Sequence, residues 1–227
     1  MKDIRAQRGR YLVQRLVEQG EHEHQDFKFA ISDARKIARS ISAFANNNGG
    51  CLLIGVKDNG SIAGVRNDED IYVVEQAAQM YCFPAVEVHF DAFKVDPGVI
   101  VIRATVPAVR PRPVRVREAD GRLRAYFRVA DENIVAHPLM VRAWQTAADT
   151  VAAPALSLDA EAAAVLDAVD KGDGIPAECA EIAVRAHLSE RTAADIIVRL
   201  AAVGVLDFAY TGHGFGIIRA ADEQKLY

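Results

Sequence analysis

The sequence lacks the features that mark several common classes of protein. Its three cysteines, Cys51, Cys82 and Cys179, are odd in number and widely spaced, which argues against a disulfide framework and a paired-cysteine metal site. No apolar run approaches the roughly 18 residues of a membrane-spanning helix, and the N-terminus has no apolar signal-peptide core. We therefore expect a cytoplasmic protein with reduced thiols and no membrane partner.

A strong overall charge is also missing. The 227 residues carry a formal net charge of −4, so the chain as a whole does not attract a polyanion, and any nucleic-acid site has to be a local basic patch. The composition, 51% hydrophobic and 26% charged, is that of an ordinary globular protein. A chain of this length forms one large domain or two small ones.

Common catalytic signatures are absent as well. The Gly-rich turn at 46–50 follows a predicted helix and is not part of a Gly-Lys-Ser/Thr sequence, so it is not a P-loop. No serine–histidine–aspartate or cysteine–histidine arrangement stands out, and no internal repeat is visible. Function therefore has to be sought in other patterns.

The stretch 32–65 is the most informative part of the chain. A helix begins at Ser32 or Asp33, whose side-chain oxygen accepts from free N–H groups of the first turn, and the Asn-Asn-Asn-Gly-Gly sequence at 46–50 ends it. An apolar strand at 51–56 follows. A later Asn-Gly pair predicts a hairpin whose second strand is 62–65.

The pattern changes after residue 144 and divides the chain into two domains. Residues 1–144 mix helices with strands, 145–157 form an Ala-rich linker, and 158–227 contain three short helices followed by a β-hairpin. That last order is typical of a winged helix-turn-helix. In the first domain we expect helices at 4–18 and 68–81, strands at 25–31, 86–95 and 99–106, and an extended hairpin at 109–128. The fold class is α+β.

Four short motifs together resemble the Schlafen-type AlbA domain. They are Gly20-Glu21, Asp26-Phe27-Lys28, the sequence AFANNNGG from Ala43 to Gly50, and IGVKD from Ile54 to Asp58. The resemblance covers about residues 20 to 144 and implies a mixed sheet with flanking helices. Domains of this type are described as DNA-binding or as divergent ATP-binding, so an assignment of ATP as a ligand would rest on the resemblance alone, and no cofactor is assigned with certainty.

The resemblance also implies a set of candidate catalytic residues. In eukaryotic Schlafen proteins, acids at three motif positions form a metal-dependent RNA-cleaving site, and the matching residues here are Glu21, Asp26 and Asp58. Three carboxylates could hold Mg²⁺ or Mn²⁺, which would activate water for phosphodiester cleavage, with Lys28 beside the phosphate. Asp26 departs from the glutamate more usual at its position. In the alternative, Glu21 and Asp26 only cap or pair, and Asp58 forms a turn.

An arginine-rich segment contrasts with the acidic chain. It contains Arg110, Arg112, Arg115, Arg117, Arg122, Arg124 and Arg128, opposed only by Glu118 and Asp120. Arginines at alternate positions of an extended segment share one face and create a local positive field. All of these except Arg122 are our candidate nucleic-acid contacts. In the alternative, the charges protect a sheet edge from pairing. The arginines of helix 4–18 are interpreted as a solvated face.

The C-terminal domain offers a second candidate surface. Arg191 and Thr192 begin its third helix, where a helix-turn-helix protein contacts a DNA groove. Glu190 and Asp195 oppose a polyanion, so docking of a protein partner is the alternative.

These patterns favour a nucleic-acid-binding protein that acts in transcription regulation, with DNA favoured over RNA. A metal-dependent endoribonuclease acting through Glu21, Asp26 and Asp58 is the main alternative, so the question of enzymatic activity stays open, with binding alone favoured. A non-catalytic dimeric scaffold that binds neither DNA nor RNA is a further alternative. Since AlbA-type modules commonly pair, we expect a two-fold homodimer.

Overall fold

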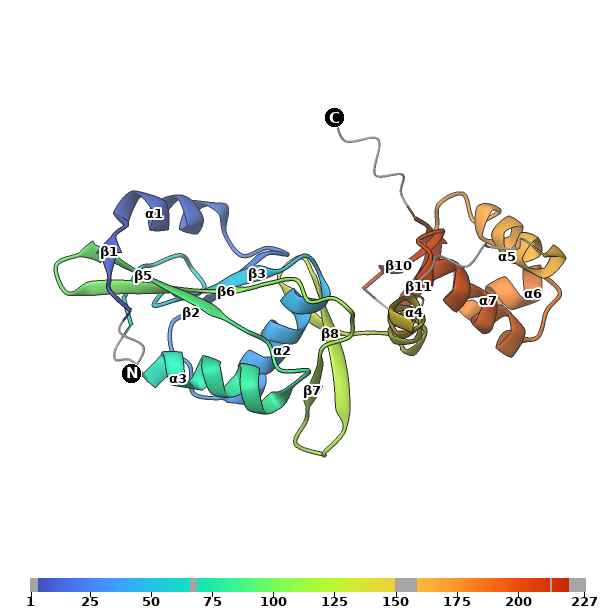
Figure 1. The fold of residues 1–227 in the computed structure, drawn as a ribbon. Helices are drawn as coiled ribbons and strands as arrows, with labels where there is room; N and C mark the ends of the chain where they lie inside the picture. The colour runs from blue at the N-terminus through green and yellow to red at the C-terminus, as the bar shows by residue number, and fades with distance from the viewer. Residues whose placement is uncertain (1–3, 66–68, 150–158, 213, 221–227) are drawn as a thin grey trace. The chain divides into compact units, whose positions relative to one another are not determined.

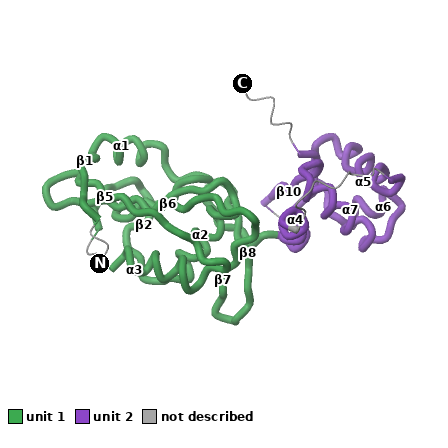
Figure 2. The backbone as a smooth tube through the Cα atoms, in the orientation of Figure 1, with its two compact units in different colours: residues 1–136 green, residues 137–227 purple. Residues whose placement is uncertain are grey.

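The chain forms two compact units, residues 1–136 and 137–227 (Figure 2). The computed structural model describes residues 4–65, 69–149, 159–212 and 214–220. The boundary between the units precedes the expected end of the first domain at Trp144, because helix α4 (Pro138–Asp149) packs against helix α7 of the second unit. Residues 145–149 of the expected linker therefore belong to α4, and its remainder lies outside the described residues.

A mixed five-stranded sheet forms the base of the first unit. Its order is β1 (Gln7–Arg8), β5 (His89–Asp96), β6 (Val99–Val106), β3 (Gly50–Ile54) and β2 (Gln25–Lys28). The β1–β5 and β2–β3 pairs are parallel, and the β5–β6 and β6–β3 pairs are antiparallel. Strand β2 is thus an edge strand.

Helices cover both faces of this sheet. Helix α1 (Arg10–Gln19) lies on one face, and α2 (Ala34–Asn46) and α3 (Glu69–Gln76) lie on the other (Figure 1). The chain continues from α3 into a π-helical turn, η1 (Ala77–Tyr81). Val13, Phe27 and Phe93 are in the core on the α1 side. The larger core on the other side contains Ile41 and Phe44 of α2.

A second, antiparallel sheet packs against α2. It consists of β4 (Cys82–Phe83), β7 (Arg115–Arg117), β8 (Leu123–Val129) and β9 (Glu132–Val135). Helix α2 contacts β3 and β6 of the first sheet and β7, β8 and β9 of the second. The helix expected to begin at Ser32 or Asp33 is therefore enclosed by two sheets as α2, and even its polar residues Ser40, Ser42 and Asn46 are buried.

Two expected elements differ in the structure for identifiable reasons. The helix expected from residue 4 begins only at Arg10, because residues 7–8 pair with β5 and Gly9 lies so close to Phe93 that a Cβ atom there would approach its Cδ1 to 2.4 Å. Residues 62–65 form no strand beyond one bridge, Val56–Ile62. Strand β3 already has β2 and β6 on its two edges, so the predicted return strand has no free edge to pair with.

The second unit contains the elements that the sequence predicts. After α4 come α5 (Ala160–Asp170), α6 (Cys179–Arg185), α7 (Glu190–Ala202) and a hairpin of β10 (Leu206–Tyr210) and β11 (Phe215–Arg219). Ser189 caps α7, because its side chain accepts from the N–H of Thr192. The assignment of this unit as a winged helix stays a prediction.

Cys51, Cys82 and Cys179 are all free thiols. Burial raises the pKa of Cys51 to about 11 and that of Cys82 to about 12, so both stay protonated at neutral pH. Among the described residues, no helix is both long and apolar enough to cross a membrane.

Candidate functional site

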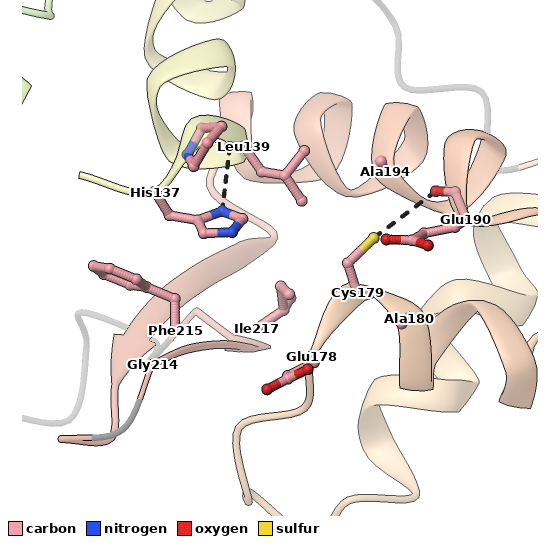
Figure 3. Close-up of a pocket in the computed structure, with 11 residues that line it drawn as sticks. His137, Leu139, Glu178, Cys179, Ala180, Glu190, Ala194, Gly214, Phe215 and Ile217 are labelled. Atoms are coloured by element: carbon pink, nitrogen blue, oxygen red, sulfur yellow. Dashed lines mark hydrogen bonds between the residues drawn. The ribbon is translucent and has the colours of Figure 1, made fainter. Parts of the chain in front are cut away.

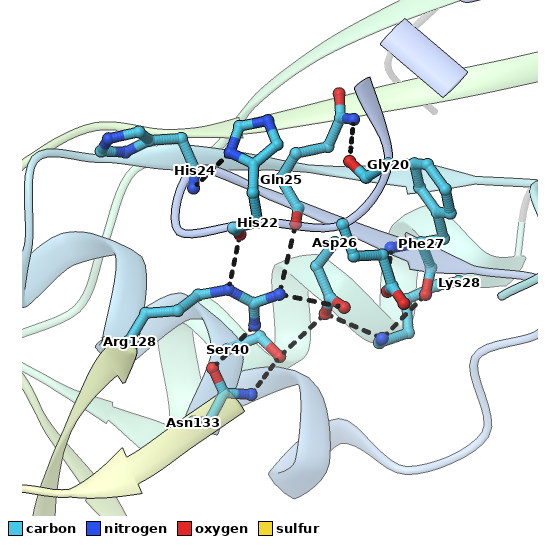
Figure 4. A network of polar contacts seen from close by, with 11 residues as sticks. Gly20, His22, His24, Gln25, Asp26, Phe27, Lys28, Ser40, Arg128 and Asn133 are labelled. Atoms are coloured by element: carbon cyan, nitrogen blue, oxygen red, sulfur yellow. Dashed lines mark hydrogen bonds and ion pairs between the residues drawn. The ribbon is translucent and has the colours of Figure 1, made fainter. Parts of the chain in front are cut away.

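Asp26 is the centre of a polar network at the β2 edge of the five-stranded sheet (Figure 4). It lies on β2 and is only 4% exposed. One carboxylate oxygen lies 2.8 Å from Lys28 Nζ and 3.4 Å from the Ser40 hydroxyl, and the other lies 3.4 Å from the guanidinium of Arg128. Two cations and a hydroxyl therefore already occupy the carboxylate.

Glu21 supports this network from the loop before β2. Its carboxyl accepts from the backbone N–H of Phe27 at 2.8 Å, a group on the open edge of the sheet, and it shares a hydrogen bond with Asp26. Burial and that hydrogen bond raise the pKa of Glu21. Burial alone would raise the pKa of Asp26, but the hydrogen bond with Glu21 and the charges of Lys28 and Arg128 outweigh it and lower that pKa. Of the two carboxyl groups, Asp26 therefore holds the negative charge more readily than Glu21.

The third expected acid does not join this pair. Asp58 is exposed in the turn after β3, and the described residues include no group of three or more His, Cys, Asp and Glu side chains that could hold a metal ion. The residues present therefore do not fit the Mg²⁺ or Mn²⁺ site that the resemblance implies. Glu21 and Asp26 instead cap and pair, as in the alternative interpretation of the sequence.

Arg128 is the clearest correction to the expected nucleic-acid contacts. Its side chain has an exposed fraction of 0%, and it donates to the carbonyls of His22 and Gln25 and to the Asn133 side chain. The guanidinium also lies 4.9 Å from the centre of the Phe44 ring. Arg128 is consequently an internal structural residue that joins β8 to β2, and it does not reach a ligand.

The asparagines of the NNNGG turn serve the fold in a similar way. The Asn46 side chain donates to the carbonyls of Val114 and Tyr126 and accepts from the N–H of Val114. The Asn47 side chain exchanges hydrogen bonds with the backbone of Arg128. Two side-chain amides thus provide hydrogen-bond partners for the part of β8 after Ala125, where the pairing with β7 has ended.

The backbone of that turn is also used internally. The amides of Asn47 and Gly49 donate to carbonyls of α2, and the amide of Cys51 donates to His24. Gly49 has φ 79°, and a Cβ atom there would lie 2.9 Å from the carbonyl oxygen of Val106, which explains why glycine is needed. These amides already have acceptors, so they are not arranged as a phosphate cradle for ATP.

The remaining arginines divide into two groups by position. Arg110 donates to the carbonyl of Asn47 and Arg112 to that of Asn46, both at the C-terminus of α2, where a positive charge is favourable. On the β7–β8 hairpin, the guanidinium of Arg117 stacks 4.5 Å from the Phe83 ring centre. Arg124 pairs with Asp120 at 2.9 Å. Arg110 and Arg117 are exposed, and Arg112, Arg115 and Arg124 are half-buried.

Glu118 does not neutralise this surface, although it lies within the segment. It is 4% exposed and bonds inward to Arg39, at 2.9 Å and 2.5 Å, and to the Tyr126 hydroxyl. The hydrogen bond with Arg39 lowers the pKa of Glu118 despite its burial, and burial together with Glu118 raises that of Tyr126 to about 12. Of the two acids in this segment, Asp120 is therefore the one that is exposed and pairs with an arginine of the segment, Arg124.

The candidate residues of the second unit lie at the start of α7. Arg191 is exposed, whereas Thr192 is half-buried with its hydroxyl 2.7 Å from that of Ser189. One turn further, Asp195 accepts from Arg142 of α4 at 2.5 Å. The negative charge of Asp195 is thus balanced within the unit by Arg142. Arg191 is exposed at the start of the same helix.

Sequence reasoning missed the side chains that hold these sites together. Ser40 and Asn133 complete the Asp26 network, while Ser42 and Asn46 bond to the second sheet. One signal was available: Ser42 and Asn46 are four residues apart, so they share one face of the predicted helix with Arg39, and this spacing indicates a common polar contact. No local pattern identifies Asn133.

The comparison with family models agrees with the resemblance in the motifs. The family model described as "Schlafen, AlbA_2" matches residues 21–137. A crystal structure of the DIP2311 protein from Corynebacterium diphtheriae is similar with a TM-score of 0.41 and 20% identity, over 86% of this chain and 34% of that one. This chain thus spans about a third of that protein. No curated protein matches the sequence.

Proposed function

The chain belongs to the Schlafen AlbA_2 family, and from that premise we propose that it binds nucleic acid without cleaving it and acts in transcription regulation, with DNA favoured over RNA. Membership of this family indicates a nucleic-acid-related function. The finer assignment rests on the arrangement of charge within this chain.

One observation carries the proposal, namely the imbalance of charge on the β7–β8 hairpin. Arg115, Arg117 and Arg124 are at least partly accessible, whereas Glu118 is turned inward by Arg39 and Tyr126. Edge protection alone needs only scattered charges. Arg124 pairs with the exposed Asp120, but with Glu118 turned inward the arginines outnumber the acids at this surface and offer bidentate donors to phosphate groups.

The existing partners of the Asp26 carboxylate favour binding over catalysis. A hydrolytic metal ion requires carboxylate oxygens that are free to coordinate it, but the Asp26 carboxylate already bonds to Lys28, Arg128 and Ser40. Asp58 lies outside this network. We therefore propose the endoribonuclease only as the alternative that the following experiment tests.

For the second unit we propose a winged helix with α6 and α7 as its helix-turn-helix. The order of three helices and a hairpin, the serine cap on α7 and the exposed Arg191 support this assignment. A first domain with an arginine-rich segment, joined to such a unit, is consistent with a regulator that binds DNA at two surfaces.

A gel-shift panel with the full chain tests the proposed function. Single- and double-stranded DNA and RNA of matched sequence are incubated with the protein in EDTA, Mg²⁺ or Mn²⁺. We expect retardation, strongest with DNA, and intact ligand in all three buffers. RNA cleavage that requires Mn²⁺ and is lost in Asp58→Ala would establish the ribonuclease instead. Absence of retardation with every ligand would leave the dimeric scaffold.

A further inference from the structure

The second unit contains a pocket that the proposed function does not use (Figure 3). Its volume is about 500 Å³, within the range of roughly 300 to 1,000 Å³ that is usual for small-molecule sites. The walls come from the start of α4, the start of α6, the start of α7 and strand β11. The pocket lies entirely within residues 137–217.

One wall of the pocket is aromatic and uncharged. The rings of His137 and Phe215 lie 5.7 Å apart, and Tyr210 extends the group with its ring 5.3 Å from that of Phe215. Nδ1 of His137 accepts from the backbone N–H of Leu139 at 3.3 Å, and burial lowers the pKa of His137. Burial thus disfavours the positively charged imidazolium form, and the ring adds an aromatic face to this wall.

The other wall is acidic. Glu178 directly precedes α6, and its side chain does not cap that helix; Glu190 is the first residue of α7. Both side chains are exposed and line the cavity. No lysine or arginine is among the described lining residues. An anionic or phosphate-bearing ligand would meet repulsion here, whereas a cation would meet two carboxylates.

We propose that this pocket binds a small organic amine in its cationic form. The ammonium group lies near Glu178 and Glu190, and the hydrocarbon or aromatic part packs against Phe215, His137 and Ile217. Charge-assisted hydrogen bonds hold the ammonium, and aromatic faces attract both the cation and apolar surface. This pairing of acids with aromatic rings distinguishes an amine from a neutral ligand of the same shape.

Calorimetric titration of the full chain with three probes of similar size tests the proposal. The probes are phenethylamine, the neutral 2-phenylethanol and the anionic 3-phenylpropionate. We expect saturable binding of the amine, at least tenfold weaker binding of the alcohol and none of the anion, since a charge-assisted bond contributes about 1.5 to 3 kcal/mol, or tenfold and more in affinity. Equal affinity for amine and alcohol, or no saturation by the amine in the millimolar range, would overturn the proposal.

Variants then locate the bound amine. Replacing both acids, Glu178→Gln and Glu190→Gln, should weaken amine binding at least tenfold, and Phe215→Ala should weaken it severalfold. Glu161→Gln is the matched control, because Glu161 is also an exposed glutamate in the first turn of a helix but lies outside the pocket. Equal weakening by the control, or no weakening by the double variant with a wild-type melting temperature, would place the amine elsewhere and refute the site.

Discussion

At the scale of single residues, the buried ion pair between Asp26 and Arg128 determines how the motif acids are used. Both side chains are almost completely buried, and an arginine in that position needs a counterion. The acid that the family resemblance assigns to catalysis thus serves here to hold β8 against β2. The half-buried Lys28 forms a second ion pair with the same carboxylate.

We expect Asp26→Asn to destabilise the protein by about 3 kcal/mol at pH 7, because it leaves a buried guanidinium without its counterion. Urea unfolding measures this difference. Glu21→Gln is the matched control, since a neutral amide can still donate to Asp26 and accept from Phe27, and it should cost less than about 1 kcal/mol. Equal destabilisation by the two variants would contradict the arrangement of the pair.

The stability of the same pair depends on pH in a defined direction. The pKa of Asp26 is lower in the folded protein than its ordinary value, which is about 3.9. Its contribution is therefore complete above about pH 4 and is lost as pH falls through the folded-state pKa. The difference in unfolding free energy between wild type and Asp26→Asn should shrink steadily below pH 4. A difference that stays constant down to pH 2 would show that the Asp26 charge is not responsible.

Asn46 provides a second test at this scale. Its side chain satisfies backbone groups of Val114 and Tyr126 that are otherwise buried without a strand partner. Asn46→Ala should therefore cost roughly 3 kcal/mol, because each buried unsatisfied group costs about 1 to 3 kcal/mol. Thermal and urea unfolding measure the loss. Asn48→Ala, in the same turn but exposed, should change stability by less than about 0.5 kcal/mol.

At the scale of elements, the β7–β8 hairpin is the surface on which the binding proposal depends. Each phosphate contact releases counterions, so each lost contact reduces the slope of log affinity against log salt by about one unit. Replacing Arg115, Arg117 and Arg124 with Ala should weaken binding to all sequences nearly uniformly and flatten the slope by roughly two to three units. Gel shifts at several salt concentrations measure both effects.

A matched triple variant controls for the change in net charge. Arg5, Arg8 and Arg15 are exposed arginines at and around α1, and their replacement removes the same charge from a surface that we expect to be merely solvated. Each variant should stay within about 0.5 kcal/mol of wild-type stability per residue. If the hairpin variant binds like wild type, the hairpin only protects an edge, and Arg191→Ala becomes the next substitution to test.

At the scale of the whole molecule, we expect a two-fold homodimer, since closed two-fold symmetry is the commonest arrangement of soluble oligomers. Light scattering at tens of micromolar protein should give twice the mass of the 24.7 kDa chain. The Asn48→Ala variant, which we expect to keep wild-type stability, should give the same mass as wild type in this measurement. A monomer mass across this concentration range would count against the dimer.

The sequence by itself determined the elements whose signals are local. Asp33 caps α2, the β5–β6 hairpin turns at residues 97–98, and Ser189 starts α7, as their turn and cap residues predict. Short-range hydrogen bonds depend on neighbouring residues, so a one-dimensional pattern is enough to locate them. Within the stretch 32–65, the predicted first helix is present as α2 (Ala34–Asn46), which contacts both sheets of the first unit.

Tertiary structure alone decided which of those residues remain available to a ligand. Arg115 and Arg128 are equivalent in the sequence as arginines of one basic segment, yet Arg128 is buried against Asp26, which approaches from a strand about a hundred residues earlier in the chain. Likewise β3 pairs with β2 and β6 and leaves no edge for 62–65, and Glu118 turns inward to Arg39. Such outcomes depend on which segments meet in space, and burial and pairing between distant segments have no local signal.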